Sequence, residues 1–156
     1  DVYFGDNNEN GLLKKMFSLR GSVPYDFLML NVSELKAYFQ SEETEFGKQS
    51  TGKPVTKIFK KALSEDFFSF VPDKSKADVI VKVSSNTIEG KKMDNYDLHT
   101  AYLSCNISIT NAQSNAEIYS TGLSDIKGMK SGGFHMAAKD AREKLKKQIE
   151  ETKKKE

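Results

Sequence analysis

The sequence predicts an α+β fold, because one stretch alternates as a strand does and a later stretch repeats as a helix does. Apolar and polar residues alternate after position 100, which places a set of apolar side chains on one face of a strand: Ala101, Leu103, Cys105, Ile107 and Ile109. Near the C-terminus, apolar residues recur every three or four positions and form one stripe on a helix: Phe134, Ala138, Ala141, Leu145 and Ile149. We therefore expect a mainly antiparallel sheet of four or more strands, with two or more helices packed on one face.

The first 66 residues show a less regular pattern than the rest. Short apolar runs predict a strand at 2–4 and a buried strand at 27–30, and residues 12–17 predict a short helix. Residues 33–46 fit two interpretations, because Ser33 is a good helix cap while Leu35, Ala37 and Phe39 alternate as in a strand.

A second helix is predicted over 55–66, with Pro54 near its first turn. Its apolar residues share the spacing of a helix face: Val55, Ile58, Phe59, Ala62 and Leu63. Phe68, Phe70 and Val71 then predict a strand that ends at Pro72.

Residues 70–150 predict the core of the fold, in the order strand, strand, strand, helix. The three strands are expected at 79–83, 101–110 and 118–126, and the helix at 134–150. The polar residues 111–115 form a short turn, which makes the second and third strands an antiparallel hairpin. Residues 89–97 are polar and are expected to form a longer loop.

Length and charge limit the classes of function. The chain has 156 residues, about the size of a single domain, so we expect 1–156 to form one α+β domain. Its 24 basic and 22 acidic residues leave a net charge of +2, too balanced for a general nucleic-acid binder. The sequence contains no apolar run of about 18 residues that predicts a transmembrane segment. Because it opens with Asp1 and not with Met, we expect a processed protein or an excised domain.

One stretch has the spacing of a phosphate-binding loop but lacks its final residue. Gly47, Gly52 and Lys53 match the pattern, yet Pro54 stands where a Ser or Thr must hold magnesium. The residues before Gly47 are polar, although such a loop follows a buried strand. We therefore interpret 47–54 as a flexible connection and expect no nucleotide binding.

A second motif resembles the first half of a calcium loop. Asp6, Asn8 and Asn10 carry side-chain oxygens at alternate positions, and Gly11 allows a sharp turn. The second half is missing, because Phe17 stands where a bidentate Glu is required. Two interpretations stay open: a turn rich in Asn and Asp, and a weak calcium site formed by Asp6, Asn8 and Asn10.

The sequence offers little for catalysis, so we expect a protein that is not an enzyme and carries no cofactor. His99 and His135 are the two histidines, too few for a zinc site with the single cysteine, Cys105. Cys105 falls on the apolar side of its strand and is expected to be a buried, unreactive side chain. The chain has no Gly-x-Ser-x-Gly motif for a nucleophilic serine.

Closely spaced phenylalanines provide candidate interaction residues. Core packing explains most of them. The alternative is that at least one of Phe67, Phe68 and Phe70 lies on the surface, where an apolar patch beside a sheet edge would bind a protein partner or a second copy of the chain.

The second half also resembles a known family. The segments that carry the resemblance are Lys76-Ala77-Asp78-Val79-Ile80-Val81-Lys82-Val83, the strand from Ala101 to Thr110, Ala116-Glu117-Ile118-Tyr119-Ser120, Ile126-Lys127-Gly128 and Ala137-Ala138-Lys139-Asp140-Ala141. Over residues 70–150 this order resembles the LPP20-like domains of bacterial lipoproteins. Those domains are similar to the α+β modules of the curli-secretion lipoprotein and of the N-terminal domain of TolB.

The resemblance implies a role in envelope assembly and transfers no catalytic residue. We therefore expect a non-enzymatic protein-interaction or assembly module, in the periplasm or associated with the outer membrane of a bacterium. The alternative is a ligand-binding or regulatory domain that uses the 6–11 loop as a weak calcium site. The sequence departs from the family at two points: no lipoprotein cysteine precedes the domain, and residues 1–66 match no family that we can name.

Overall fold

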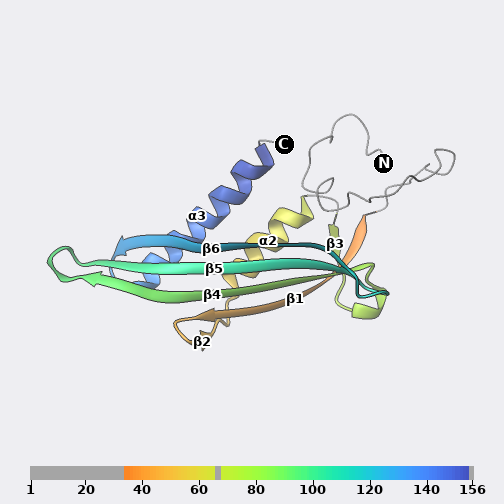
Figure 1. Cartoon of the computed structure of the whole chain (residues 1–156), viewed down its shortest axis with the longest axis horizontal. Helices are drawn as coiled ribbons and strands as arrows, with labels where there is room; N and C mark the ends of the chain where they lie inside the picture. The colour runs from red at the N-terminus through yellow and green to blue at the C-terminus, as the bar shows by residue number, and fades with distance from the viewer. Residues whose placement is uncertain (1–33, 66–67, 155–156) are drawn as a thin grey trace.

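The computed structural model describes residues 34–65 and 68–154, and in them the predicted α+β class is confirmed (Figure 1). The elements follow in the order β1 (Leu35–Glu45), β2 (Lys48–Gln49), α2 (Pro54–Ser64), β3 (Phe68–Phe70), β4 (Val79–Met93), β5 (Leu98–Asn111), β6 (Glu117–Ser131) and α3 (Phe134–Lys154). Two short 3-10 turns, η2 (Lys74–Lys76) and η3 (Asp94–Tyr96), precede β4 and β5.

The strands form one mixed sheet in the order β2-β1-β4-β5-β6, and β3 pairs with the first residues of β1. The strands β4, β5 and β6 are antiparallel neighbours, as the predicted hairpin requires. In contrast, β1 runs parallel to β4. The reason is the connection between these two strands, which includes α2 and β3 and is long enough to bring the chain back in the same direction.

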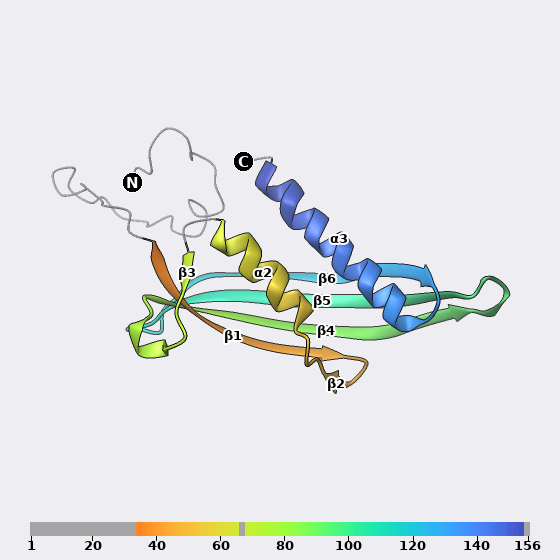
Figure 2. The same ribbon diagram turned by 180° about the vertical axis from the view of Figure 1, so that it is seen from behind.

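Both helices lie on one face of this sheet, and the opposite face is not covered by any described element (Figure 2). The five predicted apolar residues of β5 point to the helices and are at most 6% exposed. Their neighbours on β4 share that face, for instance Val81 beside Ile109. On the open face the rows are polar, as at Ser84 and Asn106. Apolar and polar residues alternate in this way in an antiparallel sheet that has one buried and one solvent-exposed face.

The structure decides two points in the first half of the chain. The ambiguous stretch is a strand, since β1 pairs with β4 along one edge and with β2 and β3 along the other. The prediction of a flexible connection at 47–54 was wrong in part, because Lys48 and Gln49 pair with β1. Phe46 and Gly47 make the tight turn between them with φ of 53° and 75°, the left-handed conformation that two-residue hairpins use.

The predicted loop at 89–97 was also wrong in part, because β4 continues to Met93 and only Asp94–Asp97 lie outside strands. The β4–β5 hairpin projects beyond the other strands in Figure 1. Residues of a projecting hairpin do not contact the core, so they can be polar. The strand therefore lacks apolar alternation, and its sequence resembles that of a loop. The predicted runs at 2–4, 12–17 and 27–30 lie outside the described residues.

The two predicted helices are confirmed, with α2 ending two residues earlier and α3 four residues later than expected. The residues of the predicted α3 stripe are buried or half-buried, and Ala138, Ala141 and Leu145 are fully buried. Within the described residues, no helix is both long and apolar enough to cross a membrane.

Helix α3 lies unusually close to the sheet at one point on β6. A Cβ atom added to Gly128 would lie 1.9 Å from the carbonyl oxygen of Ala137 and 2.6 Å from the nitrogen of Ala141. The helix residues that face this position are alanines, and Ala101 of β5 completes the contact. Small side chains on both sides therefore allow backbone to pack against backbone.

We expect Gly128→Ala to lower the free energy of unfolding by about 3 kcal/mol, because the added methyl group meets helix backbone that has no room to move. Thermal or urea unfolding measures this loss. Gly52→Ala is the matched control, because a Cβ atom there meets nothing within 4 Å. Equal stability of the two variants would show that the close packing is absent.

Candidate functional site

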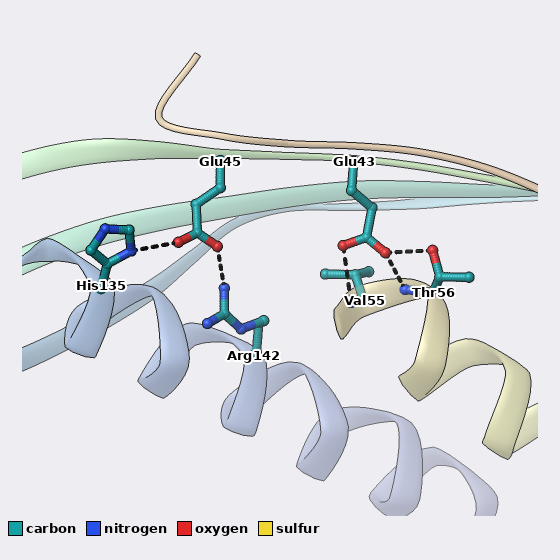
Figure 3. A network of polar contacts seen from close by, with 6 residues as sticks. All are labelled: Glu43, Glu45, Val55, Thr56, His135 and Arg142. Atoms are coloured by element: carbon teal, nitrogen blue, oxygen red, sulfur yellow. Dashed lines mark hydrogen bonds and ion pairs between the residues drawn. The ribbon is translucent and has the colours of Figure 1, made fainter. Parts of the chain in front are cut away.

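Two glutamates on β1 hold the two helices to the sheet (Figure 3). Glu43 is 2% exposed, and its carboxylate accepts hydrogen bonds from the backbone N–H groups of Val55 (3.1 Å) and Thr56 (2.5 Å) and from the Thr56 hydroxyl. The residue before the helix, Lys53, offers no side-chain cap. Glu43, which lies on β1, therefore supplies the negative charge and the hydrogen-bond acceptors that the N-terminus of α2 needs.

Glu45 lies two residues further along the same face and binds α3. Its Oε2 atom accepts a hydrogen bond from Arg142 Nη1 at 2.6 Å, and its Oε1 atom lies 2.8 Å from Nδ1 of His135. The side chains of Glu45 and Arg142 are 19% and 18% exposed, whereas His135 is largely in solvent. The Glu45–Arg142 pair is thus partly shielded from water, where a charge-assisted hydrogen bond is stronger than on an open surface.

An aromatic cluster packs next to Glu45, and His99 belongs to it. The His99 ring lies edge-on to Phe134 at 4.8 Å between centroids, and Phe134 also contacts Phe46 at 6.2 Å. Nδ1 of His99 is buried without a hydrogen-bond partner; the nearest carboxylate oxygen, on Asp97, is 3.9 Å away, which is too long for a hydrogen bond. His99 is the second residue of β5, two positions before the predicted start of that strand; its side chain faces the helices and packs as an aromatic residue.

Cys105 is buried among the core residues below the helices, with 3% of its surface exposed. Burial raises the pKa of its thiol to about 11, so the thiol stays protonated at neutral pH. In residues 34–65 and 68–154 no three His, Cys, Asp or Glu side chains are grouped so as to hold a metal ion.

The predicted interaction residues have different positions in the structure. Phe68 is 3% exposed and belongs to the core, while Phe70 is half-buried against Phe39 at 5.6 Å. The ammonium group of Lys60 lies over the rings of Phe39 and Phe70, at 5.3 and 5.6 Å. Because β3 pairs with β1 and faces the helices, the structure does not place Phe68 on the surface. Phe67 and the proposed calcium ligands Asp6, Asn8 and Asn10 lie outside the described residues.

The exposed apolar side chains gather elsewhere, on the open face of the sheet near the β4–β5 hairpin. Ile88, Met93 and Met129 are 50%, 43% and 44% exposed. Strand register places Ile88 beside Tyr102, Met93 beside Leu98, and Met129 beside Thr100. We call this group the open-face patch, and it consists of Ile88, Met93, Leu98, Tyr102 and Met129.

A bulge in β4 shapes the open-face patch. The register of β4 against β5 shifts between Glu89 and Lys92, and there the Thr100 hydroxyl accepts a hydrogen bond from Lys91 N at 2.6 Å. A Cβ atom on Gly90 would lie 2.3 Å from the Thr100 hydroxyl and 2.7 Å from the Tyr102 ring, so glycine leaves room for both side chains beside the strand. This patch is not among the residues predicted from the sequence. The local signal for it is Ile88, an apolar residue that interrupts the polar series at alternate positions of β4.

Comparisons with known proteins identify similar structures but no family. No protein-family model matches the sequence, and no curated protein matches it. Among the similar solved structures is lipoprotein GNA1162 from Neisseria meningitidis, 8% identical, with a TM-score of 0.48 over 75% of this chain and 99% of that one. The C-terminal domain of LpoB from Salmonella enterica is 13% identical, with a TM-score of 0.39 over 78% of this chain and 93% of that one. The PelC dodecamer from Paraburkholderia phytofirmans is 12% identical, with a TM-score of 0.46 over 79% and 86% of the two chains.

We expect Glu43→Gln to lower the free energy of unfolding by about 2 kcal/mol, because the amide group removes the charge at the start of α2 and leaves a buried N–H without its acceptor. Urea unfolding at neutral pH measures this loss. The neighbouring Glu42 is exposed, so Glu42→Gln should change stability by less than about 0.5 kcal/mol. Equal effects of the two substitutions would contradict the capping role.

We expect the thiol of Cys105 to react at least about 100-fold more slowly with Ellman's reagent in the folded protein than in urea at pH 8, because its raised pKa and its burial both suppress the thiolate. Raising the pH should speed the native reaction up to a pH of about 11. Reaction of the native protein at the unfolded rate would show an accessible thiol.

Proposed function

We propose that this chain is a non-enzymatic protein-interaction or assembly module of the bacterial envelope, and that it binds a protein partner through the open-face patch. The observation that carries the proposal is the cluster of large apolar side chains exposed at the hairpin end of a sheet face whose middle rows are polar.

The composition of the patch favours a protein partner. Tyr and Met are enriched at protein interfaces, and flexible Met side chains adapt their packing to the surface they meet. Polar residues surround the apolar centre, with Lys127 beside Tyr102 and Ser104 beside Asn86. An apolar centre with a polar rim is the arrangement in which a few central residues provide most of the binding free energy.

The buried polar groups support an interaction role over a catalytic one. Glu43 and Glu45 are engaged by the helices that they hold, and the thiol of Cys105 is kept protonated by burial. The location in the envelope rests on the resemblance of residues 70–150 to LPP20-like lipoprotein domains. The calcium site at Asp6, Asn8 and Asn10 stays a prediction.

The proposal is tested by comparing what the wild-type protein and patch variants capture from an envelope extract of the source bacterium. We expect Ile88→Lys and Met129→Lys to lose at least about 90% of a specifically captured protein, because each places a charge in the apolar centre. Ser84→Lys is the matched control, since it adds the same charge to a polar, exposed position on the same face.

Thermal unfolding of each variant separates a lost surface from a lost fold, and all three substituted side chains are exposed. Undiminished capture by both patch variants would refute the open-face patch as the docking surface. Equal loss with Ser84→Lys would do the same, because it would point to charge and not to the patch.

A further inference from the structure

The outer edge of β6 is protected over only part of its length. Strand β6 is the last strand of the sheet, and in the part of the chain that the structure describes no strand pairs with its outer edge. Near its end, side chains of α3 occupy the backbone groups: Asp140 accepts from Met129 N at 2.9 Å, and Lys144 donates to Lys127 O at 2.8 Å. No described side chain forms such a hydrogen bond with the backbone of Tyr119–Leu123.

Two irregularities isolate this unprotected stretch. The register against β5 shifts between Leu103 and Cys105, where Asp125 has a left-handed φ of 56°, and it shifts again between Ile109 and Thr110. Between the two shifts, Tyr119, Thr121 and Leu123 lie opposite β5 residues whose N–H and C=O groups point towards β6, so the backbone groups of these three residues point back towards β5. The N–H and C=O groups of Ser120 and Gly122 therefore point outward, free to pair with an added strand.

A groove continues from this edge along α3. It has a volume of about 370 Å³ and lies between residues 123–127 of β6 and residues 144–151 of α3. Leu123 lines it and is 38% exposed; among the described residues it is the one large exposed apolar side chain far from the hairpin end. Three lysines line the groove as well, namely Lys127, Lys144 and Lys147.

We propose that the outer edge of β6 and the groove beside it bind an extended peptide segment of a partner protein, which carries an apolar side chain next to a carboxylate. The peptide adds a short strand along Tyr119–Leu123. Its apolar side chain covers Leu123, and its carboxylate meets the lysines of the groove. Peptides bind other sheet edges in this way, with backbone hydrogen bonds for affinity and side-chain pockets for specificity.

Charge and length decide between this occupant and a second copy of the chain. Lys127 and Lys147 have no ion pair among the described contacts, whereas Lys144 is already paired with Asp140 at 2.9 Å, so two of the three groove lysines are available to a carboxylate of the peptide. An acidic ligand therefore fits better than a neutral one. The straight part of the edge spans only Tyr119–Leu123, which suits a short motif better than the full edge of another sheet.

The probe is a display library of short random peptides with free C-termini, selected on the wild-type protein. We expect the selected peptides to share an apolar residue beside Asp, Glu or the C-terminal carboxylate. Fluorescence anisotropy then gives the Kd of one synthesised peptide. Ser120→Pro should raise it about tenfold, because it deletes an outward N–H that the sheet itself does not use.

A second variant keeps the test decisive if Ser120→Pro fails to fold. Lys147→Glu reverses one charge of the groove and should raise the Kd about tenfold, while Lys139→Glu, an exposed α3 residue outside the groove, should change it less than twofold. Amide hydrogen exchange at Ser120 and Gly122 should slow when the peptide binds.

Three results would overturn the inference: no peptide enriched above the level obtained with Lys147→Glu, equal binding by Lys147→Glu and Lys139→Glu, or binding that Ile88→Lys abolishes while Lys147→Glu leaves it unchanged. The third would place peptide binding on the open-face patch and leave the proposed function intact. Loss of partner capture by the patch variants is a separate measurement, so either proposal can fail alone.

Discussion

The arrangement of the helices on the sheet depends on two carboxylates of one strand. Glu43 and Glu45 are two residues apart on β1, so both point to the same face. Glu43 caps the N-terminus of α2, and Glu45 binds Arg142 in the middle of α3. One short segment thereby determines where two helices, far apart in sequence, meet the sheet. A buried carboxylate is costly unless hydrogen bonds satisfy it, and here the helices supply those bonds.

The contacts made by the helices leave distinct regions of the sheet available. The helix-facing side is filled by small and β-branched residues, and Gly128 and the alanines of α3 let the helix approach the backbone. The opposite side is polar in its middle rows, as at Ser84 and Asn106, and carries apolar residues at Ile80 and in the open-face patch. At the outer edge, Asp140 and Lys144 form hydrogen bonds with backbone groups near the end of β6, and neither bonds to Tyr119–Leu123. The described elements therefore leave two different surfaces uncovered, one an apolar patch on the open face and one an open strand edge.

Much of the fold follows from local patterns, because they involve residues that are neighbours in one element. The alternation of β5 and the stripe of α3 predict both elements and the faces that they bury, as the structure confirms. Local patterns fail where an element is stabilised from outside. Residues 35–45 are a strand because three other strands pair with them, and residues 89–93 extend β4 because β5 continues beside them.

By itself, the sequence determined the α+β class, the position of the helices and the burial of Cys105, since hydrophobic periodicity records which side of an element avoids water. Only the tertiary structure decided the candidate surfaces. The open-face patch joins residues 88 and 129, and the groove joins residues of β6 with residues of α3, so neither forms a pattern along the chain. Strand register brings such residues together, and register depends on pairing between distant segments that no single segment encodes.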